Sequence, residues 1–293
     1  MTTAPWISSA PDAFECFDRA EALAAGAVDP AVADQVRIAV AGALGHGAEL
    51  DRTPTRDHAA DPRAAACVRF AEQFVVDVSG ITDEQRSALG AEMGTDTFTF
   101  VQFLYVVDVF QRGRIGLERI FDTPYGPAPA PTTGDLWACL EEFMRVVALG
   151  RHLDPVTTEL VRLRGARAHN CRVCQSRLSL KAVEAAGDVD IFASNANTAL
   201  DPRQEVAVAL TDALVTQPTS IDRALTTRVR DRFDTAELVE IVLDVVRNGA
   251  NKIAVALGGD AAAVSEGVEY YDVDEAGEVV ANVDRELVRA ATT

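Results

Sequence analysis

The sequence contains two similar halves, and this internal repeat constrains the fold more than any other feature. The triplet Asp61-Pro62-Arg63 recurs as Asp201-Pro202-Arg203, 140 positions later. Asp29-Pro30 recurs as Asp154-Pro155 after 125 positions, and the apolar stretch 101–115 lies over 239–253 at a shift of 138. Apolar residues match in the pairs Val36 and Val161, Val68 and Val208, and Phe74 and Leu214. The acidic residue Asp34 matches Glu159. Because the matches keep one order and one apolar register, they indicate a duplication.

The elements of each half are predicted to be helices. An Asp before a Pro is typical of a helix start, because the Asp side chain caps the first turn and Pro fits the first helical position. Within 101–115, apolar residues recur at steps of three and four, which is the period of a buried helix. Only 268–280 has two short β-prone runs around a turn. The sequence therefore predicts an all-α fold with a small C-terminal β-hairpin.

Four prolines between residues 122 and 134 mark a boundary, because such a segment cannot continue a helix. The predicted organisation has five parts. They are an N-terminal arm with a short helix (1–28), a first copy (29–121), a Pro-rich linker (122–134), a second copy (135–260), and a C-terminal hairpin with a short helix (261–293). The change in shift from 125 to 140 places about fifteen extra residues in the second copy, between Cys171 and Gly187. The first copy has His46 where Cys171 would stand.

The extra segment of the second copy carries a Cys-x-x-Cys pair, Cys171 and Cys174. Cysteines at i and i+3 at the start of a predicted helix lie on one side, where the helix N-terminus favours a thiolate. Such a pair is a redox site, half of a zinc site, or accidental. Zinc would need two further soft ligands, which are missing near the pair, so no metal or cofactor is expected. The other cysteines (Cys16, Cys67 and Cys139) lie among apolar neighbours and are interpreted as small buried residues.

Glu159, followed after twelve positions by Cys171-x-x-Cys174 and then by Ala-Ala-Gly, resembles the alkylhydroperoxidase D / carboxymuconolactone decarboxylase superfamily. The phrase Glu-Leu-Val-Arg-Leu-Arg (159–164) is similar to the entry of that family's redox helix. The resemblance implies two tandem alkylhydroperoxidase D-like helical domains, with the first lacking the Cys-x-x-Cys helix. It also implies that Cys174 attacks, that Cys171 resolves, and that Glu159 accepts or relays a proton. A homo-oligomer is implied as well, with a trimer favoured and a dimer possible.

The chain departs from this family at two positions. The family pattern is Cys-x-His-Cys-x-x-x-His, whereas Val173 and Leu178 stand at the two histidine positions here. His169, two residues before Cys171, is the nearby histidine that can replace part of the relay. Glu159 also fits a solvated first-turn glutamate, and His169 a helix-end residue. Asn248, Asn251 and Lys252 resemble the family's Asn-x-x-Asn-Arg phrase, for which hydrogen bonding at a helix end is the alternative interpretation.

Three functions remain open from the sequence. The first is a thiol-dependent peroxidase or disulfide reductase, which would use a small-molecule hydroperoxide and a thiol reductant protein or small thiol. The second is a non-redox lyase or isomerase of the carboxymuconolactone decarboxylase type, acting on a small organic acid. The third is a non-catalytic, redox-sensing oligomer. Loss of activity in a double serine variant would favour the first, and oxidation without turnover would favour the third.

The net charge of the chain limits the classes of partner that it can bind. The formal net charge is −18, which argues against nucleic acid or an anionic membrane surface, because both require basic patches. The N-terminus has no basic start followed by an apolar run, and no apolar stretch is long enough to span a bilayer. The sequence therefore predicts a cytoplasmic location.

Overall fold

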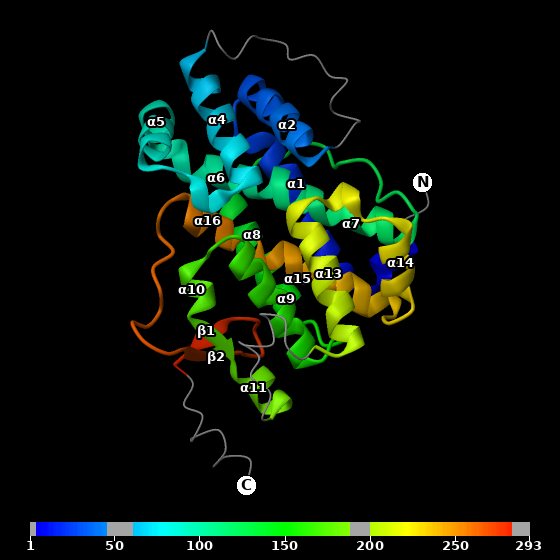
Figure 1. Ribbon diagram of the computed structural model, residues 1–293. Coiled ribbons are helices and arrows are strands. Elements are labelled where there is room, and N and C mark those ends of the chain that lie inside the picture. Colours follow the sequence, from blue (N-terminus) through cyan, green and yellow to red (C-terminus); the bar gives the residue numbers. More distant parts are fainter. Residues whose placement is uncertain (1–3, 46–60, 188–199, 283–293) are drawn as a thin grey trace.

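A computed structural model describes residues 4–45, 61–187 and 200–282. These residues are mostly helical, with a small three-stranded sheet near the C-terminus, so the predicted all-α class with a C-terminal hairpin is confirmed (Figure 1). The elements of the first half are η1 (Pro5–Ser9), α1 (Pro11–Ala27), α2 (Pro30–Leu44), α4 (Pro62–Val76), η3 (Val78–Gly80), α5 (Asp83–Met93), η4 (Gly94–Asp96), α6 (Thr97–Tyr105), the π-helical η5 (Val106–Phe110) and α7 (Gln111–Phe121). Those of the second half are α8 (Leu136–Ala148), α9 (Pro155–Ala168), α10 (Arg172–Gln175), β1 (Arg177–Ser179), α11 (Leu180–Ala186), α13 (Pro202–Thr216), η6 (Pro218–Ser220), α14 (Arg223–Arg230), α15 (Thr235–Asn248), α16 (Asn251–Ala256), β2 (Glu269–Val273) and β3 (Val279–Ala281).

The order of elements in the first half recurs in the second. The helices α4 and α13 have the same length and are followed by the matching turns η3 and η6. Each of the two helices starts at an aspartate cap. The Asp61 carboxylate accepts a hydrogen bond from the Arg63 N–H at 3.0 Å, and the Asp201 carboxylate accepts one from the Arg203 N–H at 2.7 Å. The Asp-Pro-Arg repeat in the sequence therefore marks equivalent helix starts.

The two halves share one hydrophobic core. In this core α15 of the second half packs against α7, and the two halves approach closely at two glycines, one in α7 and one directly after α15. A Cβ atom built on Gly113 would lie 2.5 Å from Val246, and one built on Gly249 would lie 2.5 Å from Val109. Because both glycines allow the same kind of close contact with the other half, the crossing is reciprocal.

One buried arginine links equivalent helix ends of the two halves. Arg112 donates to the main-chain oxygen of Val75 at 3.0 Å and to that of Val215 at 2.6 Å, at the ends of α4 and α13. Its charge is balanced by Asp108 at 2.6 Å, which also pairs with Lys252. All three charged side chains are at most 4 % exposed. Lys252 therefore has a structural partner, in line with hydrogen bonding near a helix end.

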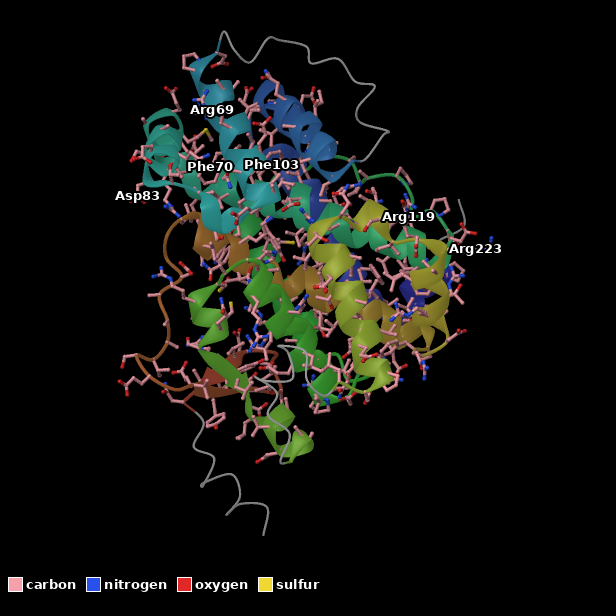
Figure 2. All side chains as sticks on the ribbon, in the orientation of Figure 1. Arg69, Phe70, Asp83, Phe103, Arg119 and Arg223 are labelled. Carbon is pink, nitrogen blue, oxygen red and sulfur yellow. The ribbon has the colours of Figure 1, made fainter. Side chains whose placement is uncertain are left out.

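The N-terminal region differs from the predicted arm. Residues 11–27 form the 17-residue helix α1, which packs along α8 and buries Phe14, Phe17 and Leu23. Pro11 occupies the first position of this helix, so the helix is longer than the short one predicted within residues 1–28. Elsewhere the usual division holds: Phe70 and Phe103 are buried inside, while Arg69, Asp83, Arg119 and Arg223 lie at the outside (Figure 2).

The segment after Cys171 is not the single helix that the sequence predicted. It forms the short helix α10, the strand β1 and then α11. Strand β1 pairs in parallel with β2, and β2 pairs antiparallel with β3, so the C-terminal hairpin extends a strand that follows the cysteine pair. The position of His46 and the predicted last short helix lie outside the described residues. Within those residues, none of the helices has the length and apolar character needed to cross a membrane.

Candidate active site

The two cysteines of the Cys-x-x-Cys pair occupy the first turn after α9, as free thiols. Cys171 precedes α10, and its sulfur accepts a hydrogen bond from the Cys174 N–H at 3.4 Å. Cys171 is fully buried, whereas Cys174 is partly exposed. Of the two thiols, Cys174 is therefore the one that a solvent-borne reagent can reach.

The surroundings of the pair shift the two pKa values in opposite directions. A hydrogen bond from Cys171, together with the charges of Arg162 and Arg177 and a hydrogen bond from Asn251, lowers the pKa of Cys174 to about 7. The hydrogen bond to Cys174 and burial raise the pKa of Cys171 well above its usual range. Around neutral pH Cys174 therefore changes from thiol to thiolate, while Cys171 keeps its proton.

Arg162 of α9 connects the cysteine segment to Glu159. Its Nη1 donates to the main-chain oxygen of Cys174 at 2.8 Å, and its Nη2 donates to that of Arg177 at 2.7 Å. Its Nε and Nη2 also bind the Glu159 carboxylate at 2.7 and 2.6 Å. This bidentate ion pair fixes the guanidinium beside Cys174, where it supports the thiolate.

Glu159 is connected to the cysteine pair through Arg162. Its carboxylate is 2 % exposed and accepts hydrogen bonds from Arg162, from the Ser179 N–H at 3.0 Å, and from the Tyr271 hydroxyl at 2.8 Å. No hydrogen bond among the described residues joins Glu159 to either sulfur. The alternative interpretation of Glu159 as a solvated first-turn glutamate is therefore wrong. The geometry makes Glu159 the anchor of Arg162.

His169 also reaches the pair through another residue. Its Nδ1 lies 2.7 Å from Oδ1 of Asn251, and the Asn251 side chain hydrogen-bonds the Cys174 sulfur. With Oδ1 accepting from His169, the Asn251 amide group donates to Cys174. Burial and the charge of Lys252 lower the pKa of His169 to about 3, so the imidazole is neutral and a weak base at physiological pH. The arrangement suits a residue that orients Asn251.

The C-terminal segment holds the cysteine turn in place. Asp260 pairs with Arg172 at 2.9 Å, and its main-chain oxygen accepts from the Val173 N–H at 3.1 Å. Glu269 of β2 pairs with Arg177 at 2.5 Å. The turn is therefore fixed on both sides by residues roughly 90 positions later in the chain.

The structure connects all four predicted site residues by hydrogen bonds, two of them through an intervening residue. Cys171, Cys174 and His169 connect through Asn251, while Glu159 connects through Arg162. The roles of Arg162 and Tyr271 were not predicted. Arg162 reaches main-chain oxygens at Cys174 and Arg177 that the fold of the 171–179 segment places beside it, and Tyr271 lies 112 positions from Glu159. The weak Asn-x-x-Asn-Lys signal did mark Asn251. Within the described ranges, no group of three or more His, Cys, Asp or Glu residues is placed to hold a metal ion.

The two positions where the superfamily has histidines have other environments. Leu178 lies in β1, 6 % exposed, in a small apolar cluster with Leu160, Leu163 and Ala182. Val173 packs against the main core and donates its N–H to Asp260. Position 178 therefore belongs to a packed apolar region rather than to the polar group around Cys174.

Comparisons with known proteins identify close relatives. Over 230 residues the chain is 40 % identical to Rv2313c of Mycobacterium tuberculosis strain ATCC 25618 / H37Rv and to MT2376 of strain CDC 1551 / Oshkosh, each described as an uncharacterized protein. The alignment covers 75 % of this chain and 81 % of each relative. No protein-family model matches the chain, and no solved structure matches it. The identity and coverage place this chain in the same protein family as Rv2313c and MT2376.

Proposed function

We propose that this protein is a thiol-dependent oxidoreductase, a peroxidase or disulfide reductase, in which Cys174 attacks and Cys171 resolves. The observation that carries the proposal is the difference between the two thiols. Cys174 is partly exposed with a lowered pKa, and Cys171 is buried with a raised pKa. An attacking cysteine must be ionised and accessible to the substrate, whereas a resolving cysteine can remain protonated until the first step is complete.

For a hydroperoxide substrate, the reaction takes two steps on the protein. The Cys174 thiolate attacks the terminal peroxide oxygen, the O–O bond breaks, and the leaving alkoxide takes a proton from water, which leaves a sulfenic acid on Cys174 and an alcohol. The Cys171 thiol then attacks the Cys174 sulfur, forming the disulfide and releasing water. A dithiol or two monothiols supply the two electrons that regenerate the pair.

The remaining residues position and tune Cys174. Arg162 and the Asn251 amide stabilise the thiolate, Glu159 holds Arg162, and His169 holds Asn251. Loss of the thiolate charge on oxidation also removes the repulsion that keeps Cys171 protonated, so the resolving thiol becomes easier to ionise when it is needed. The resemblance to the alkylhydroperoxidase D superfamily supports the same assignment of attacking and resolving cysteines.

Single cysteine variants test the proposal. With an organic hydroperoxide and a dithiol reductant, Cys174→Ser should lose turnover, and Cys171→Ser should accumulate a sulfenic acid on Cys174 that a dimedone probe labels. The control is Cys67→Ala, because Cys67 is buried and burial raises its pKa to about 12. Equal turnover in Cys174→Ser and the control would contradict the proposal.

A further inference from the structure

A cavity of about 100 Å³ lies beside the Glu159–Arg162 pair, and neither Cys171 nor Cys174 lines it. We call it the second-copy pocket. It lies between the end of α8, α9, α15 and β2, and residues that line it include Glu159, Arg162, Asp244, Arg247, Asn248 and Tyr271. Its volume matches that of about three water molecules in the liquid. The pocket therefore has room for a small organic molecule.

Two buried polar atoms in this pocket have no hydrogen-bond partner within the described part of the chain. They are Oδ2 of Asp244 and Nδ2 of Asn248, one turn apart on α15. Asp244 is 3 % exposed. Leaving a buried polar atom unpaired costs free energy, so two such atoms lining one cavity point to a ligand that pairs with both.

The charges that line the pocket favour an anion. Arg162 is balanced by Glu159, and Lys181 is balanced by Asp272 at 2.9 Å. Arg247, in contrast, takes part in no ion pair among the described residues, although its Nε donates to the main-chain oxygen of Met144 at 2.9 Å. Arg151 also lines the cavity and donates only to the main-chain oxygens of Ala148 and Gly150, while the lining Glu240 carboxylate accepts from the His152 N–H at 2.7 Å. Within the described residues, two lining cations are therefore without an ion pair, against one such carboxylate besides Asp244.

An equivalent pocket in the first half lacks these polar atoms. It is lined by Ala25, Arg37, Val106 and neighbouring residues. The repeat shifts of 125 and 138 place Arg37 on Arg162 and Val106 on Asp244. The same place in the fold is thus hollow in both halves, but the first has Val106 where the second has Asp244, and its lining carboxyl group, Glu21, is paired with Arg114.

We propose that the second-copy pocket binds a small carboxylate, whose oxygens accept hydrogen bonds from the Asn248 amide and the Asp244 carboxylic acid and lie near Arg247. The Asn248 amide can only donate at Nδ2, so it requires an acceptor. A carboxyl–carboxylate contact requires the proton that Asp244 carries when it is neutral. The ligand thus pairs with both unpartnered atoms and brings a negative charge close to Arg247, which has no ion pair among the described residues.

The protonation of Asp244 gives the binding a pH dependence. Burial raises the pKa of Asp244 to about 8. The charged groups that face it are Arg247 and Glu240 on α15, Arg151 after α8, Arg162 and Glu159 on α9, with Tyr271 on β2. Above this pKa an ionised Asp244 repels a carboxylate, so affinity should fall as pH rises through about 8.

The probe for the first test is propionate, titrated into the reduced full-length chain by calorimetry at pH 6.5, with propionamide as the neutral match of the same size. Propionate should bind saturably and propionamide about tenfold more weakly, because the amide brings no negative charge. Unsaturable propionate binding, or equal binding of the two probes, would overturn the proposal.

Variants test whether the site is the second-copy pocket. Asp244→Val introduces the residue that the first copy has at the equivalent position and should lose about tenfold or more in propionate affinity. Asp244→Asn keeps a donor without an ionisable group, so it should bind propionate with no loss above pH 8. Asn248→Ala gives an independent loss of the amide donor. Wild-type affinity in Asn248→Ala and Asp244→Val would contradict the assignment.

The binding does not depend on the thiol chemistry. Cys174→Ser leaves the pocket-lining residues unchanged and should bind propionate as the wild type does. A protein that binds propionate but does not react with hydroperoxide would therefore refute the proposed function and keep this site. The reverse result would refute the site and keep the function.

Discussion

Arg162 donates a 2.8 Å hydrogen bond to the main-chain oxygen of Cys174 while both of its other donors engage neighbouring acceptors. The guanidinium is therefore held in a fixed position beside Cys174. It cannot turn away without breaking its ion pair with Glu159, which is itself buried. We attribute the low pKa of Cys174 in part to the fixed positive charge of Arg162.

Removing the Arg162–Glu159 pair as a unit should raise the pKa of Cys174. The double variant Glu159→Gln with Arg162→Met leaves no unpaired buried charge, which a single variant would. Loss of a nearby cation should shift the thiol pKa upward by about one unit. The measurement is thiolate ultraviolet absorbance against pH, with Cys171→Ser as background to isolate Cys174.

The matched control is the ion pair between Arg164, also on α9, and Asp212 of α13. Among the described residues, no hydrogen bond joins this pair to either cysteine. The double variant Arg164→Met with Asp212→Asn should leave the Cys174 titration unchanged. An equal shift in both double variants would show that the effect is general to α9 and not due to Arg162.

His169 should remain neutral through the physiological range. Its pKa is lowered to about 3 by burial and by Lys252, so its ring resonances should not titrate between about pH 5 and 8 in an NMR experiment, whereas a free histidine titrates near 6.5. His169→Gln identifies the resonances. A midpoint near 6.5 would restore His169 as a candidate base.

This depressed pKa also predicts a stability effect. In the unfolded chain His169 takes up a proton below about pH 6.5, but the folded protein resists protonation until about 3. The unfolded state then binds more protons, so His169 makes stability fall as pH decreases between these two values. The effect is absent in His169→Gln, measured by denaturant unfolding.

Asp244→Val should stabilise the protein, and more so at higher pH. The folded-state pKa of Asp244 is about 8 and its ordinary value is 3.8, so the folded protein binds more protons and loses stability as pH rises between them. Removing an unpartnered buried carboxyl group should add about 1–3 kcal/mol. Unfolding by urea at pH 5 and pH 8 compares the two chains.

The expected gain from Asp244→Val should therefore be larger at pH 8 than at pH 5. Leu243→Ala, a truncation of the adjacent buried side chain on α15, should instead destabilise by about 2–5 kcal/mol with no such pH dependence. Destabilisation by Asp244→Val at both pH values would mean that the carboxyl group has a partner in the folded protein.

Introducing at position 178 the histidine of the alkylhydroperoxidase D pattern should not improve the site. Leu178 packs in the apolar cluster next to Leu160 and Leu163, so Leu178→His buries an imidazole without a partner and should cost about 2–4 kcal/mol. Leu178→Met is the volume-matched control. A Leu178→His chain that folds normally and reacts faster with hydroperoxide would contradict this placement.

Sequence patterns were sufficient for the helical class, the hairpin and the equivalent helix starts, because Asp-Pro caps and apolar periods are local signals. They failed where distant segments decide the structure. Residues 171–187 look helical, but β2 supplies a strand partner for 177–179 from far along the chain. The helix within residues 1–28 is longer than the predicted short helix, because it begins at Pro11 and proline fits the first helical position.

The candidate site shows the same division. The cysteine spacing and the position of Glu159 were visible in the sequence, and so was the phrase that contains Asn251. The contact of Glu159 with Tyr271 was not, since 112 positions separate the two residues. Nor could a sequence show that His169 is buried beside Lys252, which is what removes its basicity.

The most direct test of the proposed Cys171–Cys174 redox reaction is a count of free thiols after one equivalent of an organic hydroperoxide is added to the fully reduced chain. The chain has five cysteines. The account predicts that two thiols disappear together, that peptide mapping finds a Cys171–Cys174 disulfide, and that the rate rises with pH through about 7, where Cys174 ionises. Five thiols remaining, or loss of thiols at Cys16, Cys67 or Cys139 at the same rate, would contradict it.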